Sequence, residues 1–393
     1  MPRRFTHGLV VGKFYPPHAG HHHLIEVAAA ACDRVTVVVA PSSVESIPLE
    51  LRLRWLREVH AASPVRFVGV VDDHPVDYGS PRAWQAHCDV FQAAVADRVD
   101  AVFSSEDYGP ELARRFRAAH VCVDAARATV PVSGTAVRAD PVAHWHHLAS
   151  PVRAWFTRRV VVVGAESSGT TTLARALAEA LRARGGVWSA TRWVPEYGRE
   201  LTARKLAALR VTDPAATVSD ISWSAADFIE VAQAQNAAED LAARDGAPIL
   251  VCDTDARATA IWQERYLRVV SAQVRAAART PALYLLTDHA GVPFEADGLR
   301  DGEHLRGWMT ERFRTELSAV GAPVVEVSGP PAARLAAALD ACDALLASGW
   351  ALADPLPQRP AEAAVGRRHQ PRARHSGTDA RSAPRVLSPP WPG

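Results

Sequence analysis

Lysine is almost absent from this chain of 393 residues. Lys13 and Lys205 are the only lysines among 44 basic residues, and arginine supplies the rest. Acidic residues number 43, so the formal charge is only +1 and the sequence offers no basic field for nucleic acid. We therefore expect no nucleic-acid partner.

Long apolar runs and paired cysteines are lacking as well. The first seven residues contain no apolar core of signal-peptide length, and no later run is long enough to cross a bilayer. The five cysteines show no CxxC spacing, which predicts small core side chains in a reducing compartment; they are Cys32, Cys88, Cys122, Cys252 and Cys342. These absences predict a cytoplasmic protein without membrane contact.

What is present is the composition of a globular protein, with 48% hydrophobic and 22% charged residues. The chain is too long for one ordinary core, and β-rich runs alternate with helical stretches, which is typical of parallel sheets in α/β domains. We expect one such domain over residues 1–150 and a second over 151–350. From about Asp354 onward Pro, Arg, Ala, Ser and Gly dominate, so we predict that residues 351–393 form a disordered tail.

The sequence motif that dominates the first half spans residues 12–21. An apolar run, residues 8–11, leads through a glycine and proline turn into a helical stretch, and His18 and His21 fall at the start of that helix. Unpaired backbone amides and the helix dipole favour an anion there, so the motif predicts a phosphate site. A solvated histidine run or an adventitious metal tract is the alternative, but the pattern Gly-x-Phe-x-Pro-x-His-x-Gly-His is hard to obtain by chance. Its candidate site residues are Gly12, Lys13, Phe14, His18, Gly20 and His21.

A second motif, Ser133 to Arg138, follows a predicted strand over 129–132. Ser133, Thr135 and the amides behind them can bind phosphate oxygens, and Arg138 adds a charged fork. An ordinary capped helix with an exposed arginine is the alternative, but the first motif in the same domain favours a functional site. Further strands are expected at 34–40, 65–71 and 101–105, which places Ser104 with His18 beyond strand ends, where ligands of parallel sheets bind.

The second half opens with a P-loop pattern. A buried strand, residues 159–163, precedes Gly164, Ser167, Ser168, Gly169, Thr170, Thr171 and Thr172, and an Ala/Leu-rich helix follows. Backbone amides of such a loop surround phosphates, and the Thr171 hydroxyl would reach Mg²⁺. Thr170 replaces the lysine of GxxxxGK[ST], and the loss of such a donor typically costs on the order of 3–4 kcal/mol of transition-state stabilisation. We expect Arg300 or Arg306 to substitute, although a site that binds nucleotide with slow turnover and a ligand-free glycine turn remain alternatives.

Two carboxylates end the next buried strand, residues 248–252. Asp253 and Asp255 are the Walker-B-like candidates, and one would bind Mg²⁺ while the other orients the substrate hydroxyl. Asp253 fits the strand end better.

The two N-terminal motifs resemble the HxGH nucleotidyltransferases. With residues 51–56, 76–78 and 104–109, the first half is similar to nicotinamide-mononucleotide adenylyltransferases that are fused to a ribosylnicotinamide kinase. The resemblance implies a Rossmann-like HxGH domain followed by a P-loop kinase-like domain, with ATP and Mg²⁺ as cofactors and nicotinamide mononucleotide and ribosylnicotinamide as substrates. It also implies a nucleotide site that includes Ser104, Glu106 and Tyr108.

In the second half, the resemblance implies that Glu196 is the base and Tyr197 a stacking platform, with Arg199 beside them. The Asp-Gly-Leu-Arg stretch that ends at Arg300 is similar to the lid of the family, whose arginines cover the phosphates.

Two other functions are compatible with the sequence. One is a different HxGH transferase, of phosphopantetheine or choline-phosphate type, fused to a kinase. The other is a regulator that senses NAD or ATP without turnover; some relatives carry an N-terminal helix-turn-helix, but here the first strand begins within ten residues of Met1, so we expect no DNA-binding role. The sequence leaves the oligomeric state open, a homo-oligomer included.

Overall fold

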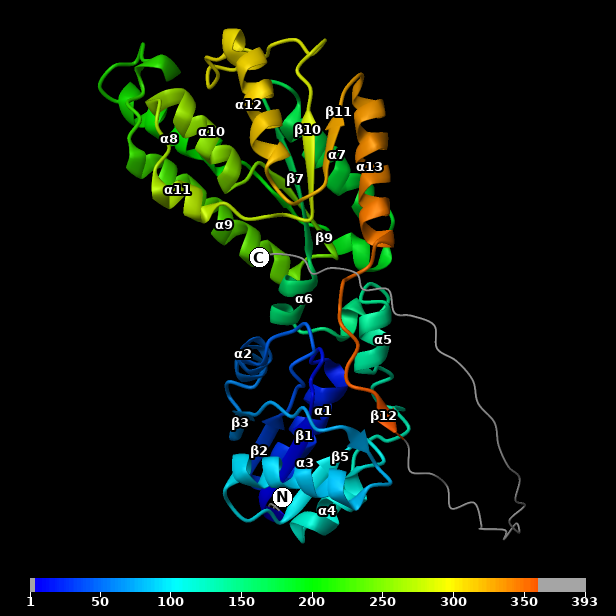
Figure 1. The fold of residues 1–393 in the computed structure, drawn as a ribbon. Helices are drawn as coiled ribbons and strands as arrows, with labels where there is room; N and C mark the ends of the chain where they lie inside the picture. The colour runs from blue at the N-terminus through cyan, green and yellow to red at the C-terminus, as the bar shows by residue number, and fades with distance from the viewer. Residues whose placement is uncertain (1–3, 360–393) are drawn as a thin grey trace, which may run out of the picture.

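A computed structural model describes residues 4–359, which form two α/β domains stacked end to end (Figure 1). Each domain is built on a five-stranded sheet in which every paired strand is parallel. The expected fold class, two parallel-sheet α/β domains, is therefore confirmed. Among the described residues, no helix is both long enough and apolar enough to span a membrane.

The sheet of the first domain has the strand order β3-β2-β1-β5-β6. Its strands are β1 (Phe5–Gly12), β2 (Cys32–Val39), β3 (Val65–Gly69), β5 (Ala101–Ser104) and β6 (Ala119–Cys122), and its helices are α1 (Ala19–Ala31), α2 (Leu49–Val59), α3 (Pro81–Val95), α4 (Gly109–Phe116) and α5 (Gly134–Ala139). Side chains alternate across a strand, so the residues of β1 divide between two separate cores, one packed against α1 and α2 and the other against α3 and α4. The central strand thus ends, at Gly12, at the point where the order of the strands reverses.

The second sheet has the order β11-β10-β7-β9-β8. Its strands are β7 (Arg158–Gly164), β8 (Trp193–Val194), β9 (Ile249–Asp253), β10 (Leu283–Thr287) and β11 (Val324–Val327). The helices around it are α7 (Thr170–Arg182), α8 (Tyr197–Arg210), α9 (Ala225–Asp245), α10 (Ala256–Leu267), α11 (Ala272–Ala277), α12 (Arg306–Ser318) and α13 (Pro331–Ala347), with 3₁₀ turns η2 (Gly186–Ala190), η3 (Val218–Asp220) and η4 (Glu303–Leu305). The apolar run of β7 is buried on both faces, as expected for the central strand of a covered parallel sheet.

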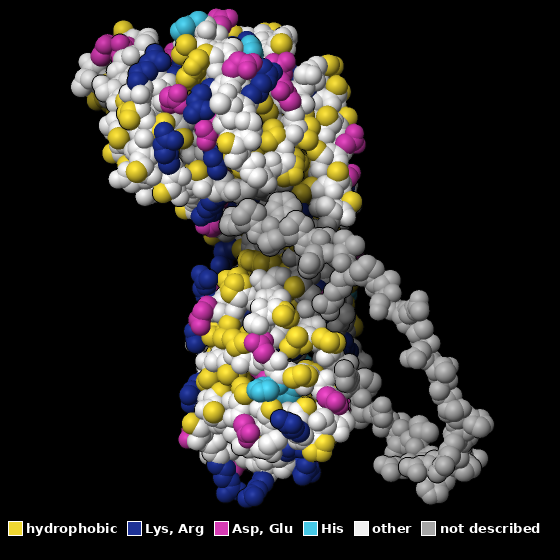
Figure 2. All heavy atoms as spheres, viewed as in Figure 1, with side chains coloured by type: hydrophobic (Ala, Val, Ile, Leu, Met, Phe, Trp, Pro, Cys, Tyr) yellow, Lys and Arg dark blue, Asp and Glu magenta, His cyan; other side chains and the backbone are white. Residues whose placement is uncertain are grey.

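The waist between the sheets is formed by η1 (Trp145–His147) and α6 (Ser150–Phe156). The indole of Trp145 donates a buried hydrogen bond of 2.9 Å to the carbonyl of Gly246 in the second domain. Arg244 and Glu58 form an ion pair across the same junction. On the face shown in Figure 2, basic and acidic side chains are interspersed over the upper domain.

The segment that follows the second domain returns to the first domain and contacts it again. After α13, residues 350–359 run back along the first domain and end in β12 (Gln358–Arg359), which pairs with β4 (Val76–Asp77). On the way, Ala353 accepts a hydrogen bond of 2.8 Å from the hydroxyl of Tyr15. We call residues 350–359 the return segment. The expectation of a disordered tail is wrong for this stretch, because its backbone is held by the first domain; residues 360–393 lie outside the described part of the chain.

Two further expectations are corrected. Residues 129–132 form no strand; the carboxylate of Asp124 accepts hydrogen bonds from the amides of Ala128, Thr129 and Val130 at 2.8–3.1 Å, which folds the segment into a loop. The sequence did not predict strand β6.

The prediction that the cysteines are core side chains is wrong for Cys122, which lies at the end of this edge strand and is exposed, whereas the other four cysteines are buried.

Candidate active sites

The loop after β1 lines a cavity of about 520 Å³ at the carboxyl edge of the first sheet. Two arginines hold this loop through its backbone. Arg52, whose side chain is fully buried on α2, donates to the carbonyl of Lys13 at 2.7 Å. Arg138 on α5 donates to the carbonyl of Tyr15 at 2.7 Å, and both guanidinium groups lie over the Tyr15 ring at 4.6 and 4.9 Å from its centroid. The position of the first motif is therefore fixed from both sides.

His18 and His21 lie side by side in this cavity, with ring centroids 3.8 Å apart. His18 is the N-cap of α1, and its carbonyl accepts the amide of His21 at 2.8 Å. A side chain at Gly20 would lie 3.2 Å from the His18 ring, which explains the glycine between the histidines. The Nδ1 atoms of both rings are buried and find no hydrogen-bond partner within residues 4–359.

Burial keeps both rings neutral. It lowers the pKa of His18 to about 3, and the neighbouring His22 lowers it further. Burial also lowers the pKa of His21 well below its usual value, and His18 contributes to that shift. Two neutral imidazoles with unpaired nitrogens are suited to donate N–H groups to an anion, whose charge would in turn stabilise their protonated forms.

The second motif forms another wall of the same cavity. The Ser133 hydroxyl caps α5 by accepting the amide of Ala136 at 3.1 Å, and Thr135 accepts from the Arg138 guanidinium at 3.2 Å. Gly134 lies so close to the first loop that a side chain there would come within 3.1 Å of the Tyr15 carbonyl. The structure thus brings residues 12–21 and 133–138 together, as the sequence predicted.

Some predicted residues of this site have other partners. The Lys13 ammonium lines the cavity but forms an ion pair of 2.9 Å with the buried Glu45. Ser104 is fully buried and hydrogen-bonds His120 at 2.9 Å, so Ser105 rather than Ser104 lines the wall. The Phe14 ring is buried and packs on His21.

The segment after β5 contributes two predicted residues to the wall. Tyr108 lines it and donates its hydroxyl to the Val11 carbonyl at 2.7 Å. Glu106 lines it too and pairs with Arg127 at 2.8 Å. Sequence reasoning missed Glu45, Arg52 and Arg127.

The second site lies at the carboxyl end of β7. Gly164 must lack a side chain because a Cβ there would come within 2.1 Å of the Thr287 hydroxyl, and Gly169 has a φ of +91° before α7 begins. The Ser168 hydroxyl closes the loop by bonding the Ala165 carbonyl at 2.6 Å and Thr287 at 2.7 Å. Residues 164–167, 170 and 171 line a cavity with the side chains of α8, β9 and α10.

Two carboxylates face each other in this second cavity. Asp253, at the end of β9, is 2% exposed, and the nearby side chains of Thr171 and Thr170 offset part of the effect of burial on its pKa. Burial raises the pKa of Asp253, and burial together with the charge of Asp253 raises the pKa of Glu196. These oxygens and the Thr171 hydroxyl are the ligand type that Mg²⁺ prefers.

Two residues predicted for this site lie elsewhere. Asp255 is the N-cap of α10, where it accepts the Ala258 amide at 2.8 Å and the Tyr284 hydroxyl at 2.6 Å. Tyr197 donates its hydroxyl to Glu230 at 2.8 Å, whereas the neighbouring Gly198 and Arg199 line the cavity. Thr172 follows the lining threonines on α7, one position deeper in the helix.

The arginines near the P-loop divide into two groups. Arg306 donates to the Ser167 and Val292 carbonyls at 3.1 and 2.9 Å, and Arg334, which sequence reasoning missed, donates to the Ser168 carbonyl at 2.8 Å. Both are buried and hold the loop from behind. Arg199 and Arg300 instead line the cavity, where each forms an ion pair with Asp297. Arg300 and Arg199 are thus placed to meet a ligand.

Comparisons with known proteins match each half of the chain to a different family model. A cytidylyltransferase-like family model matches residues 9–140, and an AAA-domain model matches residues 159–334. The trifunctional NAD biosynthesis/regulator protein NadR of Escherichia coli K12 is 26% identical over 317 residues, which cover 75% of this chain and 72% of that protein. The protein of the same description from Salmonella typhimurium LT2 is 25% identical over 321 residues, 76% of this chain and 73% of that one.

Solved structures share the fold. A NadR protein in complex with NR superposes with a TM-score of 0.63 at 22% identity, over 88% of this chain and 98% of that one. A NadR protein in complex with NAD and AMP-PNP gives a TM-score of 0.62 at 22% identity, over 87% of this chain and 96% of that one.

Proposed function

From its similarity to NadR proteins and the cytidylyltransferase-like match over residues 9–140, we propose that this enzyme transfers the adenylyl group of ATP to nicotinamide mononucleotide, which yields NAD and pyrophosphate. The observation that carries the proposal is the pair of histidines with buried, unpartnered Nδ1 atoms that share one cavity with Ser133 and Arg138. We assign this reaction to the first domain, residues 1–150.

The reaction proposed here is a direct displacement. A phosphate oxygen of the mononucleotide attacks the α-phosphorus of ATP, the new P–O bond forms, and the bond to the β-phosphate oxygen breaks. His18 and His21 donate N–H groups to the phosphate oxygens while Arg138 and Lys13 balance their charge, so catalysis is positioning and electrostatics without a protein nucleophile. The Tyr15 and Lys13 carbonyls, which Arg138 and Arg52 hold, keep these donors in place.

A His18→Ala variant tests this assignment. It leaves the sheet intact but removes one phosphate donor, so we expect kcat for NAD formation to fall by about 10²–10³-fold. NAD formation is measured by its enzyme-coupled reduction to NADH. Pyrophosphate release is measured in parallel reactions in which other phosphate compounds replace nicotinamide mononucleotide as the acceptor. Glu26→Ala, at an exposed position further along α1 that does not line the cavity, is the control. An unchanged rate in His18→Ala, or transfer to another acceptor but not to nicotinamide mononucleotide, would refute the proposal.

For the second domain, residues 151–350, we propose phosphorylation of ribosylnicotinamide from ATP, with Glu196 as the base that takes the proton of the substrate hydroxyl. Its raised pKa and its position beside Asp253 support this role. Thr171 and Asp253 would hold Mg²⁺, which supplies positive charge to the phosphates when bound. Arg199 and Arg300 line the cavity and carry charge toward the position that the missing lysine serves in other P-loops.

A kinase assay with ribosylnicotinamide and ATP tests the second activity in the full chain. We expect measurable turnover that Arg300→Gln lowers at least about tenfold, because one phosphate donor is lost. Arg306→Gln would weaken the loop instead and therefore serves as a comparison for stability rather than as a control for binding. Wild-type turnover that Arg300→Gln leaves unchanged would refute the role of Arg300.

A further inference from the structure

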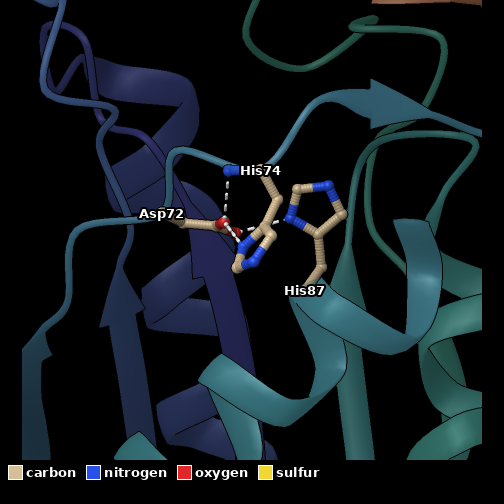
Figure 3. Close-up of side chains that lie close together, drawn as sticks. All are labelled: Asp72, His74 and His87. Atoms are coloured by element: carbon tan, nitrogen blue, oxygen red, sulfur yellow. Dashed lines mark hydrogen bonds and ion pairs between the residues drawn. The ribbon is translucent and has the colours of Figure 1, made fainter. Parts of the chain in front are cut away.

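A second group of histidines lies beside the first cavity and takes no part in the proposed reactions. Asp72 follows β3, His74 lies in the loop from β3 to β4, and His87 lies on α3 (Figure 3). The Nδ1 atoms of His74 and His87 point at the two oxygens of Asp72, at 2.9 and 2.6 Å. All three donor atoms lie within 4.8 Å of one another.

The hydrogen bonds of His87 suggest what this geometry serves. Its Nε2 lies 3.2 Å from the carbonyl of Pro75, which can only accept, so Nε2 carries a proton. In the neutral ring Nδ1 is then a bare lone pair, yet it faces a carboxylate oxygen. Such a contact is favourable if the ring is fully protonated, or, with the two atoms slightly further apart, if both of them bind one cation. A ring N–H that is oriented by a backbone carbonyl while the other nitrogen faces a cation is the usual arrangement of metal-bound histidine.

We propose that Asp72, His74 and His87 bind a divalent transition-metal ion of the Zn²⁺ or Co²⁺ class. Two imidazole nitrogens and one carboxylate oxygen suit such ions and not Mg²⁺, which requires oxygen ligands. Donors in a tetrahedral Zn²⁺ site lie about 2.0–2.2 Å from the ion and hence roughly 3.3 Å from one another. Asp72 lies 2.9 and 2.6 Å from the two rings, so binding would require the rings to move slightly away from Asp72 and toward each other. The His74 side chain is 46% exposed and lies in a loop, which permits this movement.

The site would join the loop between β3 and β4, which carries Asp72 and His74, to α3, which carries His87. The three residues line a cavity of about 150 Å³ together with Lys13, Tyr108 and Leu356 of the return segment. Gly12, Lys13, Tyr78 and Tyr108 also line the larger cavity that contains His18 and His21. A bound ion would therefore fix the loop before β4 to α3 and hold one wall of the candidate adenylyl-transfer site, with its fourth coordination position open to the small cavity.

Titration of the full chain with Co²⁺, without nucleotide and with Mg²⁺ in excess, tests the proposal through the visible absorption of tetrahedral cobalt. We expect one equivalent to bind, to be displaced by Zn²⁺, and to raise the thermal unfolding temperature. His74→Ala and Asp72→Asn should each weaken binding at least about 100-fold, since even partners of ligands are worth 10–100-fold. Because His74 is half exposed, its removal tests binding without threatening the fold.

Two control variants define the outcomes. Asp89→Asn removes an exposed carboxylate two residues beyond His87 on α3 and should leave Co²⁺ binding unchanged. A variant with His144, His146 and His147 all changed to alanine removes another group of clustered rings and should also bind Co²⁺ as wild type does. Loss of binding in this triple variant with retention in His74→Ala would overturn the proposal, as would the absence of a stoichiometric cobalt spectrum in wild type. In the latter case His87 is an imidazolium held by Asp72.

Discussion

The buried ion pair beneath the first motif gives a prediction about stability and catalysis together. Arg52 donates to Glu45 at 2.6 Å, to the Ile47 carbonyl at 2.6 and 2.9 Å, and to the Lys13 carbonyl at 2.7 Å. Neither the Arg52 nor the Glu45 side chain is exposed to solvent. Replacement of Arg52 by methionine preserves the apolar stem but removes every one of these donors.

The cost of Arg52→Met follows from what stays behind. Removing one member of a buried ion pair typically costs about 3–5 kcal/mol, because the partner charge is left without compensation. Here Lys13 remains 2.9 Å from Glu45, which reduces the loss, whereas two carbonyls lose a donor, which increases it by about 1 kcal/mol or more each. We therefore expect the free energy of unfolding of the first domain to fall by about 4 kcal/mol, roughly a thousandfold in the unfolding equilibrium.

Native-state hydrogen exchange measures this loss in the first domain alone. Amides in the centre of β1 and β2 should exchange about a thousandfold faster in Arg52→Met, while those of β7 and β9 should not change. Arg54→Met, an exposed arginine two residues along the same helix, should change stability by less than about 0.5 kcal/mol. In the double variant Glu45→Leu/Arg52→Met the effects should not add, because the carboxylate that Arg52→Met leaves uncompensated is then absent and only the Lys13 ammonium loses a partner.

The activity of the same variants gives a second readout. The Lys13 carbonyl loses its donor, so we expect KM for ATP to rise in Arg52→Met but not in Arg54→Met. The reasoning is refuted if Arg52→Met exchanges no faster than Arg54→Met in β1.

Three further predictions concern the two sites. Thr170→Lys should raise the rate of ribosylnicotinamide phosphorylation by about 10²-fold or more, since it restores a phosphate donor; an equal or lower kcat would show that other cations already occupy that position. If Glu196 is the base, its raised pKa should make the wild-type kinase rate rise with pH as this carboxyl group loses its proton, and Glu196→Gln should abolish that rise. A pH–rate profile of unchanged shape would exclude Glu196 as the base. The pKa values of His18 and His21 are lowered by burial, so below about pH 6.5 the unfolded chain binds protons that the folded chain does not. The contribution of the two rings to the free energy of unfolding should therefore be fully present above pH 7 and fall by up to about 1.4 kcal/mol per pH unit for each ring as the pH drops toward 4. In urea unfolding measured at several pH values, the free energy of unfolding of His18→Gln/His21→Gln should depend less steeply on pH than that of wild type; an identical dependence on pH would contradict the neutral rings.

The elements with a strong local pattern were predictable. Valine-rich strands such as β1 and β7 show their burial in a continuous apolar run, and glycines at fixed offsets identify the turns that follow them. Residues 12–21 and 133–138 could be paired because both motifs need the carboxyl edge of one sheet. β6 was missed because Ala119–Cys122 is a short edge strand with partly exposed side chains, which leaves no periodic signal.

The errors at the sites have a common physical cause. The sequence favours Asp253 at the strand end but keeps Asp255 as a candidate, and only the helix that begins after Asp255 turns that carboxylate into a cap. Likewise, Arg306 was chosen for its charge, but its donors are used by backbone carbonyls. A signal for Arg52 does exist: it lies within the apolar stripe of Leu49, Leu53 and Leu56, and an arginine at such a position requires a buried acceptor. Hydrogen-bond partners of this kind come from distant segments, which local patterns do not encode.

The return segment affects how the protein can be divided. Trp350 donates to the Phe156 carbonyl, Ala353 is bonded to Tyr15 and to Ser46, and Pro355 and Leu356 border the two cavities of the first domain. A fragment cut after residue 150 would therefore leave part of its ligand-binding wall on the other fragment. Supplying residues 350–359 as a separate peptide would restore that wall. The first domain and its ligand site are therefore built from two segments that are far apart in the sequence, with the second domain inserted between them.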